Sequence, residues 1–188
     1  KHRAIETATM VEIDPGVVEL CREHLPSISR GAFDDPRAEL VFADGVEFVA
    51  RCAARYDVVI VDSTDPIGPG EVLFTEGFYR DCGRCLAPGG VLVTQNGVPF
   101  LQARELAGTL AALRRIFADA TCYLATVPTY VGGPMAFGWG TDDAGLRRTA
   151  IDVLRARFRE AGIKTRYYTP EVHQAAFALP GYIAELIA

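Results

Sequence analysis

The sequence has no long apolar run and no excess of positive charge. None of its apolar stretches approaches the roughly 18 residues that a membrane-spanning helix needs, so we expect no transmembrane segment. Lysine and arginine number 19 against 24 aspartates and glutamates, a net charge of −5. This balance excludes the basic surface on which nucleic-acid binding depends. The first residues, Lys1-His2-Arg3-Ala4, lack the apolar block of a signal peptide, and we expect a cytoplasmic protein.

Histidine and cysteine are scarce and are not spaced like metal ligands. The three histidines lie far apart, at positions 2, 24 and 173. The five cysteines, at positions 21, 52, 82, 85 and 122, are an odd number, which fits a reduced compartment better than a disulfide framework. Cys82 and Cys85 form a CxxC pattern, but neither a second such pair nor a histidine pair accompanies it. A redox or metal-binding role for this pair is therefore the less favoured interpretation.

Segments typical of strands alternate with segments typical of helices along the chain. With 188 residues, 49% of them hydrophobic, the chain is long enough for one domain with a buried core. We expect strands over residues 7–11, 40–43, 57–62, 91–95, 120–127 and 135–141. We expect helices over residues 15–25, 46–54, 71–86 (beginning at Glu71 or Thr75), 102–117 and 144–161, then two short helices punctuated by Pro170 and Pro180. Residues 27–37 are expected to form a loop, and residues 87–90 to stop the third helix.

This alternation predicts an α/β fold with a mostly parallel sheet and helices on both faces. The nearly continuous β-branched run over residues 57–62 predicts a central strand buried on both faces. The last two strands have no helix between them, so we expect one of them to run antiparallel to the rest of the sheet.

Ligands in such sheets bind at the carboxyl ends of the strands. That rule selects four polar residues at strand ends, namely Glu12, Asp44, Asp62 and Gln95. A carboxylate at the position of Glu12 can accept from both ribose hydroxyls, whereas Asp14 is better placed to cap the helix that Pro15 opens. Asp44 and Gly45 fit either an adenine amino group or an ordinary Asp-Gly turn, and the sequence leaves both open.

The segment Asp62-Ser63-Thr64-Asp65-Pro66-Ile67-Gly68-Pro69 places two carboxylates just beyond a predicted buried strand. Two acceptor-only groups suit a cationic ligand or, alternatively, a divalent metal ion. The loop offers no further oxygen ligands, so we favour the cation and expect no metal. Tyr130 lies in a second rigid loop, where its ring can pack on an amine, on adenine or in the core.

Several of these segments resemble those of polyamine aminopropyltransferases, most closely bacterial spermidine synthases. They are Val11-Glu12-Ile13-Asp14, Asp44-Gly45, the loop from Asp62 to Glu71, Gln95-Asn96-Gly97, Pro128-Thr129-Tyr130 and the tail from His173 to Pro180. The resemblance covers essentially the whole chain and implies a Rossmann-like fold of the class I methyltransferase type. It also implies transfer of an aminopropyl group from decarboxylated S-adenosylmethionine to putrescine, giving spermidine and 5′-methylthioadenosine. The donor is a co-substrate, and no cofactor is expected.

The resemblance also assigns roles to individual residues. Glu12 would hold the ribose, Asp44 with Gly45 the adenine side, and Pro69 would touch the nucleoside. On the amine side, Asp62 would be the catalytic base, Asp65 would bind the diamine, Gln95 would face the amine and Tyr130 would line its channel.

The family has an amino-terminal β domain and a glycine-rich loop that this chain does not contain. We therefore expect residues 1–188 to be a single catalytic domain, truncated at its N-terminus, with little activity alone. The resemblance implies a homodimer for the longer protein. The sequence leaves the acceptor open among putrescine, cadaverine, agmatine and spermidine. The alternative functions are an S-adenosylmethionine-dependent methyltransferase and a non-catalytic polyamine-binding fragment.

Overall fold

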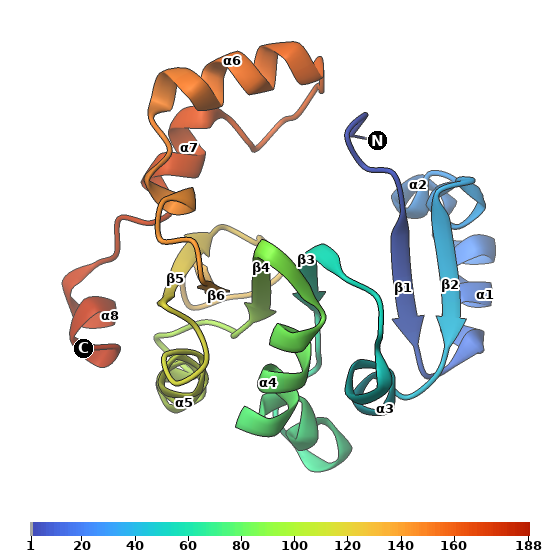
Figure 1. The fold of residues 1–188 in the computed structure, drawn as a ribbon, viewed down its shortest axis with the longest axis horizontal. Coiled ribbons are helices and arrows are strands. Elements are labelled where there is room, and N and C mark those ends of the chain that lie inside the picture. Colours follow the sequence, from blue (N-terminus) through green and yellow to red (C-terminus); the bar gives the residue numbers. More distant parts are fainter. Residues whose placement is uncertain (1) are drawn as a thin grey trace.

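The structure is a computed structural model that describes residues 2–188, and it has the expected α/β architecture (Figure 1). Its strands are β1 (Ala8–Glu12), β2 (Ala38–Phe42), β3 (Tyr56–Val61), β4 (Leu86–Gln95), β5 (Asp119–Ala125) and β6 (Met135–Thr141). Its helices are α1 (Pro15–His24), α2 (Pro26–Ser29), α3 (Gly45–Arg51), α4 (Glu76–Arg84), α5 (Ala103–Leu113), α6 (Ile151–Ala161), α7 (Pro170–Ala175) and α8 (Gly181–Leu186). Three 3₁₀ helices connect them, η1 (Ala32–Asp34), η2 (Gly68–Phe74) and η3 (Leu146–Arg148). Among the helices within residues 2–188, none is both long and apolar enough to cross a lipid bilayer.

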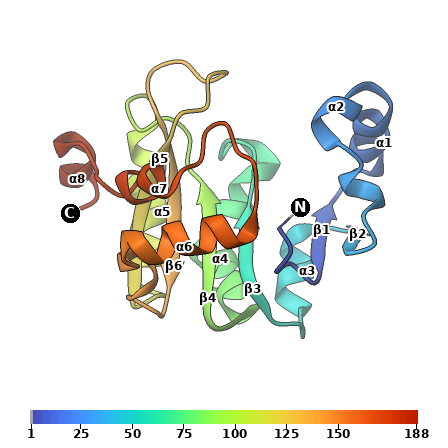
Figure 2. The same ribbon diagram turned by 90° about the horizontal axis from the view of Figure 1, so that it is seen from above.

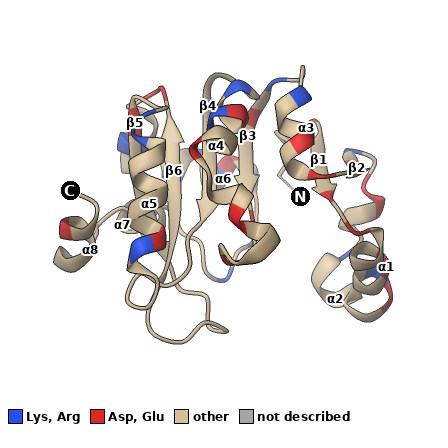
Figure 3. Ribbon diagram, turned by 90° about the horizontal axis from the view of Figure 1, so that it is seen from below, with Lys and Arg blue, Asp and Glu red and all other residues tan. Residues whose placement is uncertain are grey.

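The strands form two sheets rather than the single sheet predicted. β1 and β2 pair in parallel, and a second sheet has the order β3-β4-β6-β5. β3 and β4 are parallel, while β6 is antiparallel to both of its neighbours, which confirms that one of the last two strands is reversed. Helices α4 and α5 cover one face of the larger sheet, and α6 and α7 lie on the other (Figures 1 and 2). Within residues 2–188, acidic and basic residues are interspersed rather than segregated by sign (Figure 3).

Side-chain caps fix where four of the helices begin, among them α7, where Thr169 Oγ1 accepts from Val172 N–H at 3.1 Å. The carboxylate of Asp14 accepts from the backbone N–H of Gly16 at 2.8 Å, so its predicted capping role is confirmed. The carboxylate of Asp44 caps α3 in the same way through Val46 N–H at 2.7 Å. Thr75 caps α4, which therefore begins at the later of its two predicted starts.

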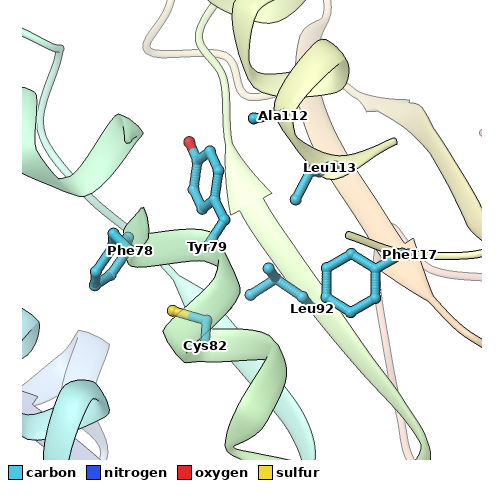
Figure 4. Packing of buried hydrophobic residues seen from close by; sticks show 7 residues of the cluster. All are labelled: Phe78, Tyr79, Cys82, Leu92, Ala112, Leu113 and Phe117. Atoms are coloured by element: carbon cyan, nitrogen blue, oxygen red, sulfur yellow. The ribbon is translucent and has the colours of Figure 1, made fainter. Parts of the chain in front are cut away.

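The core of the larger sheet lies between β4 and the helices α4 and α5. It contains Phe78, Tyr79, Cys82, Leu92, Ala112, Leu113 and Phe117 (Figure 4). Burial raises the pKa of Cys82 to about 12 and that of Cys85 to about 11, so both thiols are protonated at neutral pH. The CxxC pair is therefore core packing without thiolate character.

Four predicted element boundaries are wrong, each for a local reason. Residues 27–37 contain α2 and η1, because Pro26 is preset for a first helical turn and the left-handed Arg30 ends it. Helix 144–161 begins only at Ile151, since the hydroxyl of Thr149 donates to the Leu146 carbonyl and the backbone there is extended. The predicted stop at residues 87–90 lies inside β4, where Gly90 permits close approach to the Tyr56 carbonyl. Helix 102–117 ends at Leu113, after which the N–H groups of Arg115 and Ile116 bond carbonyls only three residues back.

β3 is not the doubly buried central strand that its sequence predicts. Val59 and Val61 pack against the core cluster, as expected for alternate residues on one face. Val58 is 53% exposed and Ile60 is 70% exposed, and β3 forms the edge of the four-stranded sheet. Within residues 2–188, no strand pairs with the edge of β3 that faces away from β4. The apolar character of this strand therefore exceeds what its described neighbours bury.

Candidate active site

A cavity of about 540 Å³ lies between β1 and β3 and reaches the carboxyl ends of both strands. Its polar end is lined by Glu12, Gly45, Asp62 and Ser63. Its walls are apolar and come from both strands, from α3 and from α4, with Val11, Phe48, Val59, Ile60, Leu73 and Phe78 among them. An apolar slot with carboxylates at one end suits a ligand with a flat ring and a polar, hydroxyl-bearing or cationic part.

Glu12 is held in place by its own backbone turn. Its Oε1 accepts from the N–H of Asp14 at 3.0 Å, and its side chain is half-buried at the end of β1. The same carboxylate lines the cavity. A fixed acceptor in this position can bind the vicinal hydroxyls of a sugar.

Asp44 and Gly45 have different structural roles. Gly45 lines the cavity, while Oδ1 of Asp44 is used by the α3 cap. Oδ1 of Asp44 is thus engaged by the helix cap, and the adenine interpretation of this pair stays a prediction. Gly45 has no Cβ, and nothing lies within 4 Å of the position that a Cβ would occupy. A ligand can therefore approach the backbone closely at this point.

The loop after β3 presents Asp62 and Asp65 to solvent on a fixed backbone. The N–H of Ile67 donates to the Asp65 carbonyl at 2.7 Å. A Cβ at Gly70 would lie 2.7 Å from Thr64 Oγ1 and 2.9 Å from the Asp65 carbonyl oxygen, so only glycine fits there. The loop is thus preorganised, and its carboxylates need little rearrangement to bind a cation.

The other predicted site residues lie outside the cavity lining. Gln95 is half-buried at the end of β4, and Pro69 is exposed in η2. Tyr130 is 50% exposed in the loop between β5 and β6, which excludes the alternative of core packing. That loop rests on the segment after β4, because Gly132 lies close to the side chains of Leu101 and Val98.

Two polar residues at the start of α5 belong to this site, and the sequence analysis missed them. Nε2 of Gln102 donates to Asp65 Oδ1 at 3.0 Å and to Glu105 Oε2 at 3.2 Å. Burial and the nearby charge of Asp65 raise the pKa of Glu105 to about 7. Their signal in the sequence was their spacing, one helical turn apart directly after a strand-end segment.

The acidic side chains of this site are not arranged as a metal-binding group. Among residues 2–188, no group of three or more histidine, cysteine, aspartate or glutamate side chains is arranged to hold a metal ion. Asp62 and Asp65 are both exposed, and two acceptor-only carboxylates are suited to a cationic group.

An α/β fold with carboxylates gathered where parallel strands end is typical of enzymes that bind nucleosides at that edge. Residues 1–149 match the family described as spermine/spermidine synthase domain, so the chain belongs to this family. Two solved spermidine synthases share its fold. One, in complex with the transition state analogue AdoDATO, has a TM-score of 0.90 and 33% identity over 99% of this chain and 62% of its own. The other, from Thermotoga maritima, has a TM-score of 0.87 and 32% identity with the same coverage. The predicted methyltransferase-like α/β fold is thereby confirmed.

Curated relatives are similar over the whole chain. The polyamine aminopropyltransferase of Ruegeria sp. is 58% identical over 186 residues, which are 99% of this chain and 66% of that protein. Polyamine aminopropyltransferase 1 of Pseudomonas aeruginosa is 57% identical over 187 residues, covering 100% of this chain and 65% of the relative. The chain therefore spans slightly less than two thirds of the length of these relatives.

Proposed function

We propose that this chain is the catalytic domain of an aminopropyltransferase that makes spermidine and 5′-methylthioadenosine from putrescine and decarboxylated S-adenosylmethionine. The observation that carries the proposal is the single cavity that joins Glu12 and Gly45 to Asp62, with Asp65 in the adjoining loop. The identity of 51–58% to polyamine aminopropyltransferases supports the same activity.

In this proposal the slot between β1 and β3 takes the nucleoside. Glu12 binds the ribose hydroxyls, Gly45 lets the adenine approach the backbone, and Asp44 contributes on the adenine side. Pro69 in η2 closes over the nucleoside product. The apolar walls of the slot support this assignment, because an adenine ring gains free energy when its faces leave water.

The amine is bound and activated by the loop after β3. The electrophile is a methylene attached to a sulfonium, and the sulfur leaves as a neutral thioether with the bonding electrons. The reaction therefore needs neither an acid nor a cofactor. What it needs is an unprotonated amine in line with that methylene. We assign the base to Asp62, the anchoring of the second ammonium to Asp65, and the lining of the amine channel to Tyr130 and Gln95.

Proton transfer from the amine to Asp62 is uphill in water. The reference pKa of an alkyl ammonium is about 10.4 and that of aspartate about 3.9, a gap worth roughly 9 kcal/mol. Desolvation of both partners narrows the gap, because it destabilises each charged form.

We further propose that polypeptide beyond these residues completes the site. The chain spans 65–66% of its relatives, and β3 leaves Val58 and Ile60 exposed beside the slot. By the family resemblance, the missing part precedes this chain and carries residues for the donor. The resemblance likewise supports a homodimer and a cytoplasmic location.

Donor discrimination tests the proposed function. The protein, with the preceding part of its relatives restored, is incubated with decarboxylated or intact S-adenosylmethionine and with putrescine, cadaverine, agmatine or spermidine. Products are identified by mass spectrometry. We expect an aminopropylated amine and 5′-methylthioadenosine from the decarboxylated donor, with putrescine preferred. Methylated products from the intact donor would contradict the proposal and establish a methyltransferase.

A further inference from the structure

The proposed function leaves Gln102 and Glu105 without a role, although both sit behind the amine-binding loop. Gln102 is the only described side chain that hydrogen-bonds the Asp65 carboxylate, at 3.0 Å, and the same amide nitrogen reaches Glu105 at 3.2 Å. One NH₂ group therefore joins two carboxylates that would otherwise repel each other.

The orientation of the Gln102 amide is fixed from its other end. Its Oε1 accepts from the backbone N–H of Val98 at 3.0 Å, so the NH₂ group must face the two carboxylates. Gly97 packs directly against this amide in a left-handed conformation (φ +58°), and a Cβ there would overlap the Gln102 side chain. The bridge is thus built into the backbone that leads from β4 to α5.

On the side away from the loop that carries Asp65, Glu105 lies next to Asn96, which belongs to a buried polar network. Asn96, fully buried, accepts from Thr94 Oγ1 at 2.7 Å and donates to Thr109 Oγ1 at 2.9 Å. Tyr79 OH lies 3.2 Å from the same Thr109 hydroxyl. This network links α4, β4 and the second half of α5, and it fixes α5 against the sheet.

We propose that Glu105 is a positioning residue for the amine acceptor. Acting through Gln102, it fixes the Asp65 carboxylate and adds a second negative charge behind it, so the site favours amines with two or more positive charges over monoamines. This inference rests on the proposed role of Asp65 in amine binding.

The charge of Glu105 responds to the amine and to pH. Among residues 2–188, two titratable groups face it, Asp65 from the loop after β3 and Tyr79 from α4, while the segment after β4 presents the neutral Asn96. Burial raises the pKa of Tyr79 to about 12, so the charge of Asp65 is the one that matters near neutral pH. Burial and Asp65 raise the pKa of Glu105 to about 7. A bound ammonium near Asp65 offsets that repulsion, so amine binding must lower the pKa of Glu105.

The direct test is a carbon-13 NMR titration of the Glu105 and Asp65 carboxyl groups in the protein with the preceding part of its relatives restored, with and without millimolar putrescine. We expect putrescine to shift both signals and to lower the pKa of Glu105 by about one unit. In Asp65→Asn, the pKa of Glu105 falls without amine and no longer responds to it. If putrescine moves the Asp65 signal while the pKa of Glu105 stays unchanged, the inference is wrong and the role of Asp65 stands. If putrescine moves neither signal, the amine site itself is wrong.

A kinetic test separates the charge of Glu105 from its packing. Glu105→Gln keeps an oxygen that can accept from Gln102 but removes the charge, and Glu160→Gln, on the exposed face of α6, is the matched control. In the transferase with its preceding part restored, we expect Glu105→Gln to raise KM for putrescine about fivefold and leave kcat within twofold. The fall of KM with rising pH near 7 should disappear, while KM for a monoamine should not change. Equal KM values and pH profiles in the parent, Glu105→Gln and Glu160→Gln would overturn the inference.

Discussion

At the scale of single residues, the account depends most on Asp62. It stands at the carboxyl end of β3, lines the slot and belongs to a loop with little freedom. Replacing it with asparagine keeps the shape and removes the base. We expect Asp62→Asn to lower kcat by about 10²–10⁴ at neutral pH, with the affinity for the donor changed less than twofold.

Rapid-quench assays and donor titrations measure these two quantities. Asp57→Asn is the matched control, because Asp57 is exposed at the opposite end of the same strand. Turnover in Asp62→Asn that equals turnover in Asp57→Asn would show that another group takes the proton.

The glycine at position 70 gives a second prediction about the same loop. Its missing Cβ leaves room for Thr64 Oγ1 and the Asp65 carbonyl. Gly70→Ala should therefore displace Asp65 and raise KM for the amine about tenfold or more. Gly77→Ala, in the open first turn of α4, should leave KM unchanged. Steady-state kinetics of the two variants measure the contrast, and equal KM values would argue against a preorganised loop.

Glu105 also makes stability depend on pH. Its pKa is about 7 in the folded chain against an ordinary value of 4.5. A raised folded pKa means that the folded chain binds the extra proton, so stability is lost as pH rises from about 4.5 through 7. We expect Glu105→Gln to raise Tm by about 2 °C at pH 8 and to leave it unchanged at pH 4. Thermal unfolding followed by circular dichroism at the two pH values measures this, and an equal shift at both would contradict the raised pKa.

At the scale of elements, β3 is the strand whose sequence and surroundings disagree. Its apolar run predicts burial on both faces, yet Ile60 is 70% exposed in this chain. If the preceding polypeptide covers that strand, Ile60→Thr should change stability by less than about 0.5 kcal/mol in the 188-residue chain and by more than about 1 kcal/mol in the longer protein.

Leu92→Ala provides the reference for this comparison, because Leu92 is fully buried in the described core and should cost about 2–5 kcal/mol in both forms. Urea unfolding of Ile60→Thr and Leu92→Ala, each in the 188-residue chain and in the longer protein, measures the four changes in the free energy of unfolding. An equally small effect of Ile60→Thr in both forms would mean that nothing covers β3 in the longer protein.

The sequence predicted elements better than it predicted their environment. The order of the strands and helices, the reversed strand and the short helices at Pro170 and Pro180 are confirmed. Predicted helix boundaries were wrong where a local hydrogen bond outweighed the hydrophobic periodicity. An example is Thr149, whose hydroxyl donates to the backbone carbonyl of Leu146. Burial of β3 could not be predicted, because a strand's neighbours are set by the whole sheet.

The candidate site was predictable only in part. Glu12, Gly45 and Asp62 share one cavity because the ends of parallel strands meet at one edge. Gln102 and Glu105 were missed because the hydrogen bond that joins them to the loop runs from Gln102 to Asp65, 37 positions away. Such a contact depends on the turn at Gly97 and on the packing of α5, and neither leaves a local pattern in the sequence.

At the scale of the whole molecule, the proposed function makes this chain a domain that holds part of an active site. The chain spans 65% of one relative and superposes on a solved spermidine synthase over 99% of its own length. In that proposal, its described residues supply one side of the nucleoside slot and the carboxylates of the amine site. We therefore expect activity to depend strongly on polypeptide outside these residues.

The most direct measurement of the central claim is product formation by two forms of the protein. The 188-residue chain and a form with the preceding part restored are each incubated with decarboxylated S-adenosylmethionine and putrescine. The account predicts spermidine and 5′-methylthioadenosine in equal amounts from the longer form and little of either from the chain alone. Failure of the longer form to react with any amine, in a folded state that binds 5′-methylthioadenosine, would contradict it.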